Sequence, residues 1–174
     1  MGLEIFNAKQ TPLSDDEVRS VVEIEQHSEV RRWLTIYVDD DFEKEFQSYR
    51  RFFRSLPKEK EVEVLVAKYD GRVAGFLALW RLEEYMEHVA SIGISVHPDF
   101  WGKGVATRLI RSAIELARER GFKRLEVESL AENLAMRRTA EKLGFKLEGT
   151  RVKRIRKDGS YHDEVAYFLF LDDA

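Results

Sequence analysis

Residues 92–107 are IGISVHPDFWGKGVAT, the most informative stretch of the chain. An apolar, strand-like run ends before Pro98, two glycines flank Lys103, and an amphipathic helical pattern begins directly behind them. This order of strand, glycine loop and helix N-terminus leaves backbone N–H groups free to bind an anion. Glycine lets the backbone approach a ligand closely, and the helix dipole favours negative charge at that end. The segment therefore predicts a phosphate-binding loop in an α/β protein.

Two common phosphate-binding motifs fit this loop poorly. A P-loop requires Gly-Lys followed by Ser or Thr, whereas Gly102-Lys103 is followed by Gly104. The dinucleotide motif Gly-x-Gly-x-x-Gly fits both glycines but has Thr107 at its third position. A nucleotide- or nucleic-acid-binding module is therefore the weaker alternative, and a net charge of −3 argues against nucleic acid.

A second motif begins at Asn133 and ends in the run Glu141-Lys142-Leu143-Gly144-Phe145, as in a helix opened by asparagine and stopped by glycine. Together with Val96-His97-Pro98 and Gly104-Val105-Ala106, it resembles the GNAT superfamily of acetyl-CoA-dependent N-acetyltransferases. Trp101 stands where the family signature has Arg or Gln. In this respect the chain is similar to the branch that acetylates ribosomal-protein N-termini and several small amines.

The resemblance covers Val62 to Leu171 and implies a mixed, mostly antiparallel twisted sheet with a central parallel pair and about four flanking helices. We expect one α/β (α+β) domain over residues 1–174. The hydrophobic pattern agrees with this fold, because its helical and strand-like periods alternate along the chain. The expected strands are Leu3–Phe6, Val62–Tyr69, Val73–Leu82, His88–Val96, Leu125–Leu130, Phe145–Ile155 and Val165–Leu171. The expected helices follow a capping box at Ser14, a cap within Asp39 to Asp41, the glycine loop that ends at Gly104, and Asn133.

The composition is typical of a cytoplasmic globular protein. The chain has 174 residues, 44% hydrophobic and 35% charged, with no apolar run long enough to span a membrane. Its first ten residues lack the pattern of a secretory signal. Cysteine is absent and the four histidines are scattered, so no metal site is expected.

The resemblance implies that acetyl-CoA binds along the glycine loop and beside the preceding strand. Asn133 is expected to cap its helix and to hydrogen-bond the pantetheine arm, while Arg137 either reaches the ribose or 3′-phosphate or is solvated. Trp101 either anchors the loop in the core, which we favour, or shields the pantetheine. The alternative for the loop is an ordinary turn whose glycines only relieve crowding. The expected cofactor-binding residues are Ile94, Ser95, Val96, Trp101, Gly102, Lys103, Gly104, Val105, Ala106, Thr107, Asn133 and Arg137.

Acetyl transfer requires a base, because an alkylammonium with a pKa near ~10.4 keeps its proton at neutral pH. Alternation along residues 125–130 places Glu126 and Glu128 on the face opposite the apolar residues. Glu128 is the favoured base, with Glu84 and His88 as further candidates; a paired surface carboxylate is the alternative interpretation of Glu128. Many relatives have a tyrosine as the acid for the thiolate, where this chain has Ala140. Tyr161 and Tyr167 are other candidates for that acid.

We expect direct transfer to a primary amine, since no cysteine is present to form an acyl-enzyme. The acceptor is a peptide N-terminus or a small amine such as a polyamine. Acidic groups at 39–41 and 83–87 either attract this cation or simply cap a helix and face solvent, which we favour. A catalytically silent acyl-CoA sensor is the rival function. The family also makes a homodimer plausible, and no nucleic acid or membrane partner is expected.

Overall fold

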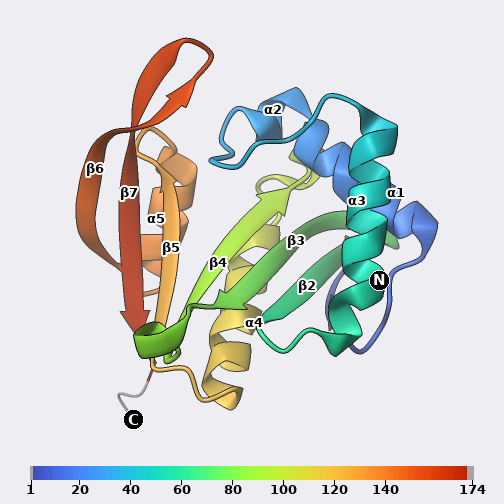
Figure 1. Ribbon diagram of the computed structural model, residues 1–174, viewed down its shortest axis with the longest axis horizontal. Helices are drawn as coiled ribbons and strands as arrows, with labels where there is room; N and C mark the ends of the chain where they lie inside the picture. The colour runs from blue at the N-terminus through green and yellow to red at the C-terminus, as the bar shows by residue number, and fades with distance from the viewer. Residues whose placement is uncertain (1, 172–174) are drawn as a thin grey trace.

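The computed structural model describes residues 2–171, in which one seven-stranded sheet runs through the molecule (Figure 1). The spatial order is β1-β2-β3-β4-β5-β7-β6. Every neighbouring pair is antiparallel except β4 and β5, which are parallel, and this confirms the predicted fold class. The strands are β1 Leu3–Asn7, β2 Val62–Tyr69, β3 Arg72–Arg81, β4 Val89–Val96, β5 Arg124–Leu130, β6 Lys146–Lys157 and β7 Ser160–Phe170.

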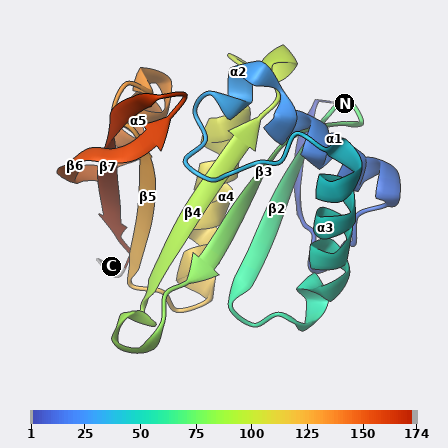
Figure 2. The ribbon, with the colours of Figure 1, turned by 45° about the horizontal axis from the view of Figure 1, so that its top comes forward.

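Helices cover both faces of the sheet. Figures 1 and 2 show α1 and α3 on one face and α4 on the other. The helices are α1 Asp15–Gln26, α2 Ser28–Arg31, α3 Phe42–Ser55, α4 Val105–Glu119 and α5 Leu134–Lys142, with short turns η1 Leu56–Lys58, η2 Glu84–Met86 and η3 Pro98–Phe100. The single turn α2 was not predicted, because it has too few residues to show a period. No helix within residues 2–171 is long and apolar enough to cross a membrane.

Local sequence signals explain where the first long helices begin. Ser14 and Glu17 form a reciprocal capping box, in which Glu17 N–H donates to Ser14 Oγ at 3.2 Å and Ser14 N–H donates to Glu17 Oε1 at 2.9 Å. Asp41 accepts from Lys44 N–H at 3.1 Å and caps α3. Asp39 pairs with Lys44 and Asp40 with Arg31, so the acidic group at 39–41 serves capping and ion pairing, as favoured from the sequence.

Strand β7 begins at Ser160 rather than at the predicted Val165. Asp158 and Gly159 both have positive φ, 51° and 76°, and connect β6 to β7 in a tight turn. Pairing therefore starts directly after the turn, at Lys157 and Ser160, and the hairpin is longer than its apolar residues indicated.

The alternation of side chains along β3 creates two hydrophobic cores, one on each face. Phe76 and Ala78 face the core under α1 and α3, while Leu77 and Leu79 face the core under α4. Burying a leucine such as Leu77, which is completely enclosed, contributes about 1.5–3 kcal/mol. These two cores hold β2–β4 rigidly between the helices, so β4 is a fixed edge for the opening described next.

Strands β4 and β5 pair over only four residues, from Val89 with Arg124 to Ile92 with Val127, and then diverge. Beyond this point β4 remains paired with β3 alone, up to Val96. The side chains of β4 on the α1 face are small: Ser91, Gly93 and Ser95, beside Trp80, Ala78 and Phe76 of β3. Divergence and small side chains together leave a hollow in this face of the sheet.

Candidate active site

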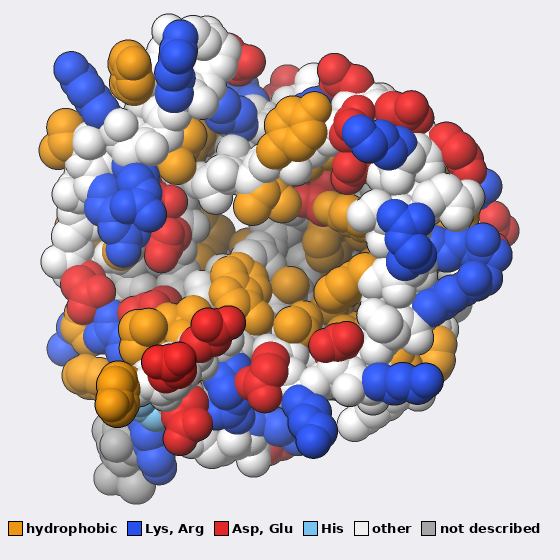
Figure 3. Space-filling model, in the orientation of Figure 1, with side chains coloured by type: hydrophobic (Ala, Val, Ile, Leu, Met, Phe, Trp, Pro, Cys, Tyr) orange, Lys and Arg blue, Asp and Glu red, His pale blue; other side chains and the backbone are white. Residues whose placement is uncertain are grey.

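A cavity of about 1200 Å³ occupies the opening between β4 and β5. Figure 3 shows it as a deep hollow at the centre of the molecule, with hydrophobic side chains gathered inside. Its walls come from α1, α3, β3, β4, β5, the start of α4, α5 and the loop after α2. A volume of this size is typical of a ligand-binding site rather than of a packing defect.

The glycine loop forms one end of the cavity and presents free backbone donors to it. Gly102 and Gly104 have φ of 76° and 78°, and a Cβ added to either would meet nothing within 4 Å. The glycines are thus required by backbone conformation and not by crowding. No amide from Gly102 to Thr107 has a hydrogen-bond acceptor within residues 2–171, whereas Arg108 N–H bonds Gly104 O at 3.0 Å. Gly104 offers no side-chain cap, so these amides and the α4 dipole form an anion-binding end.

The structure brings most of the predicted cofactor-binding residues to the cavity. Lys103 and Arg137 are the exceptions: the Lys103 ammonium lies over the Tyr69 ring, 5.4 Å from its centroid, outside the cavity lining. The predicted residues that line it are Ile94, Ser95, Val96, Trp101, Gly102, Gly104, Val105, Ala106, Thr107 and Asn133.

The prediction that Trp101 is buried in the core is wrong. Its side chain is 46% exposed and lines the cavity. The indole Nε1–H donates to Val96 O at 2.8 Å, which ties the loop to the end of β4. Because the chain turns outward here, the indole anchors the loop through this hydrogen bond rather than through core packing.

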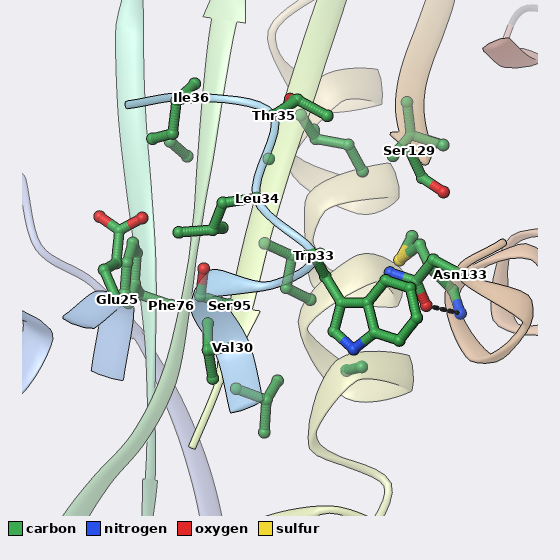
Figure 4. Close-up of a pocket in the computed structure, with 18 of the residues that line it drawn as sticks. Glu25, Val30, Trp33, Leu34, Thr35, Ile36, Phe76, Ser95, Ser129 and Asn133 are labelled. Carbon is green, nitrogen blue, oxygen red and sulfur yellow. Dashed lines mark hydrogen bonds between the residues drawn. The ribbon is translucent and has the colours of Figure 1, made fainter. Parts of the chain in front are cut away.

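Asn133 caps α5, with its Oδ1 accepting from Met136 N–H at 3.2 Å. Figure 4 shows its side chain beside the indole of Trp33, and both residues line the cavity. Arg137 is held away from the cavity, because its Nε donates to Tyr167 Oη and its Nη1 to Ala131 O, both at 3.0 Å. The Tyr167 hydroxyl in turn donates to Glu141 at 2.7 Å, so this tyrosine is a buried structural link outside the cavity lining.

Of the three predicted catalytic residues, only Glu128 lines the cavity. Its carboxylate lies 3.3 Å from Arg151 Nη1, which also donates to the buried Glu164 at 2.9 Å. Burial, followed by the negative charge of Glu164, raises the pKa of Glu128 above that of an ordinary glutamate. Glu84 and His88 are exposed near the other end of β4, before its first residue, and do not reach the cavity.

Glu25, on α1, is a cavity residue that the sequence analysis missed. Its side chain is 4% exposed, and the Tyr49 hydroxyl donates to its Oε1. Burial raises the pKa of Glu25; the Tyr49 hydrogen bond opposes this shift and the charge of Glu45 reinforces it. The signal was present, because Glu25 continues the apolar stripe of Val18 and Val21, where a charged residue is uncommon.

The loop after α2 closes one side of the cavity with Trp33, Leu34, Thr35 and Ile36. Lys157, at the end of β6, holds this loop: its ammonium donates to Arg31 O at 2.5 Å and Leu34 O at 2.7 Å. Burial lowers the pKa of Lys157. The bridge joins the end of the β6–β7 hairpin to the loop, which lie near each other in Figure 2.

Comparisons with known proteins fit this geometry. A model of the acetyltransferase (GNAT) family matches residues 19–145, so the chain belongs to that family, as its two motifs predicted. The L-amino acid N-acetyltransferase AaaT of Escherichia coli is 33% identical, over 62% of this chain and 67% of that protein. Spermidine N(1)-acetyltransferase of Escherichia coli is 27% identical, over 94% and 86%.

The fold is also similar to that of yncA from Salmonella typhimurium, a putative acetyltransferase solved with acetyl-CoA. The TM-score is 0.79 at 24% identity, covering 100% of this chain and 96% of that one. With three of the curated relatives, the matched region spans 56%, 64% and 67% of their length.

Replacing Glu25 by glutamine should stabilise the folded protein at neutral and alkaline pH. Because the pKa of Glu25 is raised on folding, the free energy of unfolding falls as pH rises through the interval between its unfolded and folded values. Glu25→Gln removes this loss and keeps an acceptor for Tyr49. Thermal unfolding should show a gain on the order of 1 kcal/mol at pH 8 and a smaller one at pH 5.

Glu23→Gln is the matched control, since Glu23 is exposed on the same helix. It should change stability little at either pH. A stability gain for Glu25→Gln that is equal at both pH values would contradict the conclusion that folding raises the pKa of Glu25.

Replacing Lys157 by methionine should loosen the loop over the cavity. The substitution removes two charge-assisted hydrogen bonds to loop carbonyls and leaves no buried charge behind. Amide hydrogen exchange in residues 32–37 should become about tenfold faster, while exchange in α4 is unchanged. Lys146→Met, at the exposed start of β6, should leave the loop's exchange at the wild-type rate.

Proposed function

We propose that the protein is an acetyl-CoA-dependent N-acetyltransferase that transfers the acetyl group directly to a primary amine, either a peptide N-terminus or a small amine. The observation that carries this proposal is the shared cavity: free amides at the start of α4, the buried carboxylate of Glu25 and the partly exposed carboxylate of Glu128 all line it. Membership of the acetyltransferase family and the yncA complex with acetyl-CoA support it.

The residues present suit acetyl-CoA. The amides from Gly102 to Thr107 hold its pyrophosphate, since they are unpaired and lie at the positive end of the α4 dipole. Within the described chain, no lysine, arginine or histidine side chain lines the cavity, so the amides rather than side-chain cations supply this contact. The pantetheine arm lies along the unpaired edge of β4 towards Asn133, where amides and the asparagine side chain can bond its own amides.

The acetyl group of acetyl-CoA supplies an activated carbonyl, and the protein supplies a base and a donor for the developing negative charge. Glu128 takes a proton from the acceptor ammonium, and its raised pKa brings it closer to neutrality, where a base works best. A backbone N–H of residues 94–96 stabilises the carbonyl oxygen while the C–N bond forms and the C–S bond breaks. The first proton passes from Glu128 to solvent. The second proton, which nitrogen loses after it has attacked the carbonyl, balances the thiolate, so the products are an amide, a thiol and one released proton.

Gly104→Asp should weaken acetyl-CoA binding by more than tenfold in titration calorimetry. The substitution strains a residue held at positive φ and places a carboxylate among the phosphates. Gly104→Ala separates these effects, because it has the strain without the charge and should lose less affinity.

Gly121→Asp is the control for strain at the opposite end of α4, where φ is 82° and the space is also open. It should leave affinity within about twofold of wild type. Wild-type affinity in Gly104→Asp would rule out the phosphate-binding role of the loop.

Glu128→Gln should lower kcat by about 100-fold or more and leave acetyl-CoA affinity unchanged. A base acts only when deprotonated, so wild-type kcat/KM should rise with pH through the raised pKa of Glu128, and the variant should lose this rise. Steady-state thiol release over a pH series measures both effects without background, since the protein contains no cysteine.

Glu148→Gln, an exposed glutamate on β6, serves as the control and should keep the wild-type profile. Full turnover in Glu128→Gln would remove Glu128 from the mechanism. Tight acetyl-CoA binding with no transfer to any amine would instead favour an acyl-CoA sensor.

A further inference from the structure

The half of the cavity under α1 and α3 is walled by apolar side chains that remain partly exposed. Ile36 is 60% exposed, and Phe52 and Trp80 are each 37% exposed. They come from the loop after α2, from α3 and from β3, and all three line the cavity. Large apolar side chains from separate elements that converge on a cavity without filling it form a surface for an apolar ligand group.

Four carboxylates line the cavity, and three of them have a basic side chain as a partner within the described chain. Glu126 lies 2.8 Å from Arg124, Glu128 lies 3.3 Å from Arg151, and Glu132 lies 2.5 Å from His162. Glu25 is different: among residues 2–171 it has no cation within ion-pairing distance, and its side-chain hydrogen bond is with Tyr49. Glu25 is therefore the one carboxylate of the cavity lining that has no basic side chain as a partner among residues 2–171.

Figure 4 places the Glu25 carboxylate next to Phe76 and Ser95, on the opposite side of the cavity from Asn133. A cation is the natural partner for this carboxylate, because a buried charge is otherwise costly. The other three carboxylates already lie beside Arg124, Arg151 and His162, so a second cationic group on the same ligand would either compete with these side chains or be desolvated against apolar ones. A carboxylate on the ligand would also lack a partner, since no lysine, arginine or histidine lines the cavity in the described chain.

We infer that the acceptor is a primary amine with one positive charge and an apolar substituent. Its ammonium is attracted into the cavity by Glu25 before Glu128 removes its proton, and its substituent packs against Ile36, Phe52 and Trp80. Polyamines and free amino acids are then poor acceptors. This inference rests on the proposed function and narrows its acceptor. The same chemistry occurs in a small arylalkyl or alkyl amine and in a peptide that begins with an apolar residue.

Matched amines test separately whether a second ammonium and whether a carboxylate on the ligand make it a poorer acceptor. Hexylamine and hexamethylenediamine differ by a second ammonium, and phenethylamine and phenylalanine differ by a carboxylate. In each pair we expect kcat/KM to be about tenfold or more higher for the first compound. Spermidine should behave like the diamine. Phenylalanine amide, which has no carboxylate, should be accepted. If its kcat/KM is higher than that of phenethylamine, the natural acceptor is a peptide N-terminus. If its kcat/KM is lower, the natural acceptor is a small amine.

The assay follows thiol release from acetyl-CoA with the 174-residue chain, corrected for hydrolysis without amine. The inference would be overturned if spermidine, hexamethylenediamine or phenylalanine were accepted as well as the matched monoamine. The proposed function would still stand in that case. No transfer to any compound in the panel would count against the proposed function itself. The two failures are thus distinguishable.

Substitutions at Glu25 and Phe52 test whether these residues recognise the ammonium and the apolar substituent of the acceptor. Glu25→Gln should raise KM for hexylamine, lower kcat/KM by about tenfold, and leave acetyl-CoA affinity unchanged; its thermal stability, measured in parallel, shows that it is folded. Phe52→Glu adds a carboxylate without a basic partner to the apolar wall and should reduce the preference for hexylamine over hexamethylenediamine, whereas Phe52→Leu should retain this preference. Unchanged KM in Glu25→Gln, or an unchanged preference in Phe52→Glu, would overturn the assignment.

Discussion

The short parallel ladder between β4 and β5 is the constraint on which the rest of the site depends. A parallel pair requires a crossover, here α4, whose N-terminus lies at the end of β4 where the two strands have separated. Pairing stops at Ile92 and Val127, so the edge of β4 up to Val96 and the start of α4 face the same opening. Unpaired strand amides and unpaired helix amides therefore meet in one cavity, a result that a continuous sheet would prevent.

The residues that keep the cavity open reduce the stability of the folded protein. Ser91, Gly93 and Ser95 occupy strand positions where larger apolar side chains would fill the hollow, and Glu25 buries a carboxylate that raises the cost of folding at neutral pH. The two cores, centred on Leu77 and its neighbours on one face and on Phe76 and its neighbours on the other, offset these costs. Destabilising residues confined to one hollow of a well-packed sheet are the usual signature of a site selected for function.

What could be predicted from the sequence was encoded by residues close together in the chain. The glycine loop and the capping role of Asn133 follow from local backbone chemistry, and the position of Glu128 follows from the alternation of one strand. The tertiary relations could not be predicted in this way. Glu25 meets Tyr49 across two helices, and Lys157 binds carbonyls in a loop more than a hundred residues earlier, at Arg31 and Leu34. Neither contact has a sequence signal beyond a charge in an apolar stripe.

Within the described residues, no lysine, arginine or histidine side chain lines the cavity. This affects both ends of the site, the start of α4 and the surroundings of Glu25. Under the proposed function, phosphates held by neutral amides need no lysine or arginine nearby, so no positive side chain of the cavity lining competes with an acceptor ammonium for Glu25. A guanidinium at position 101, as in the family signature, would add such a charge to the loop, whereas Trp101 adds an indole that bonds Val96 O. Under the proposed function, the replacement at Trp101 and the unpartnered carboxylate of Glu25 belong to one electrostatic arrangement, in which backbone dipoles serve the anionic donor and Glu25 serves the cationic acceptor.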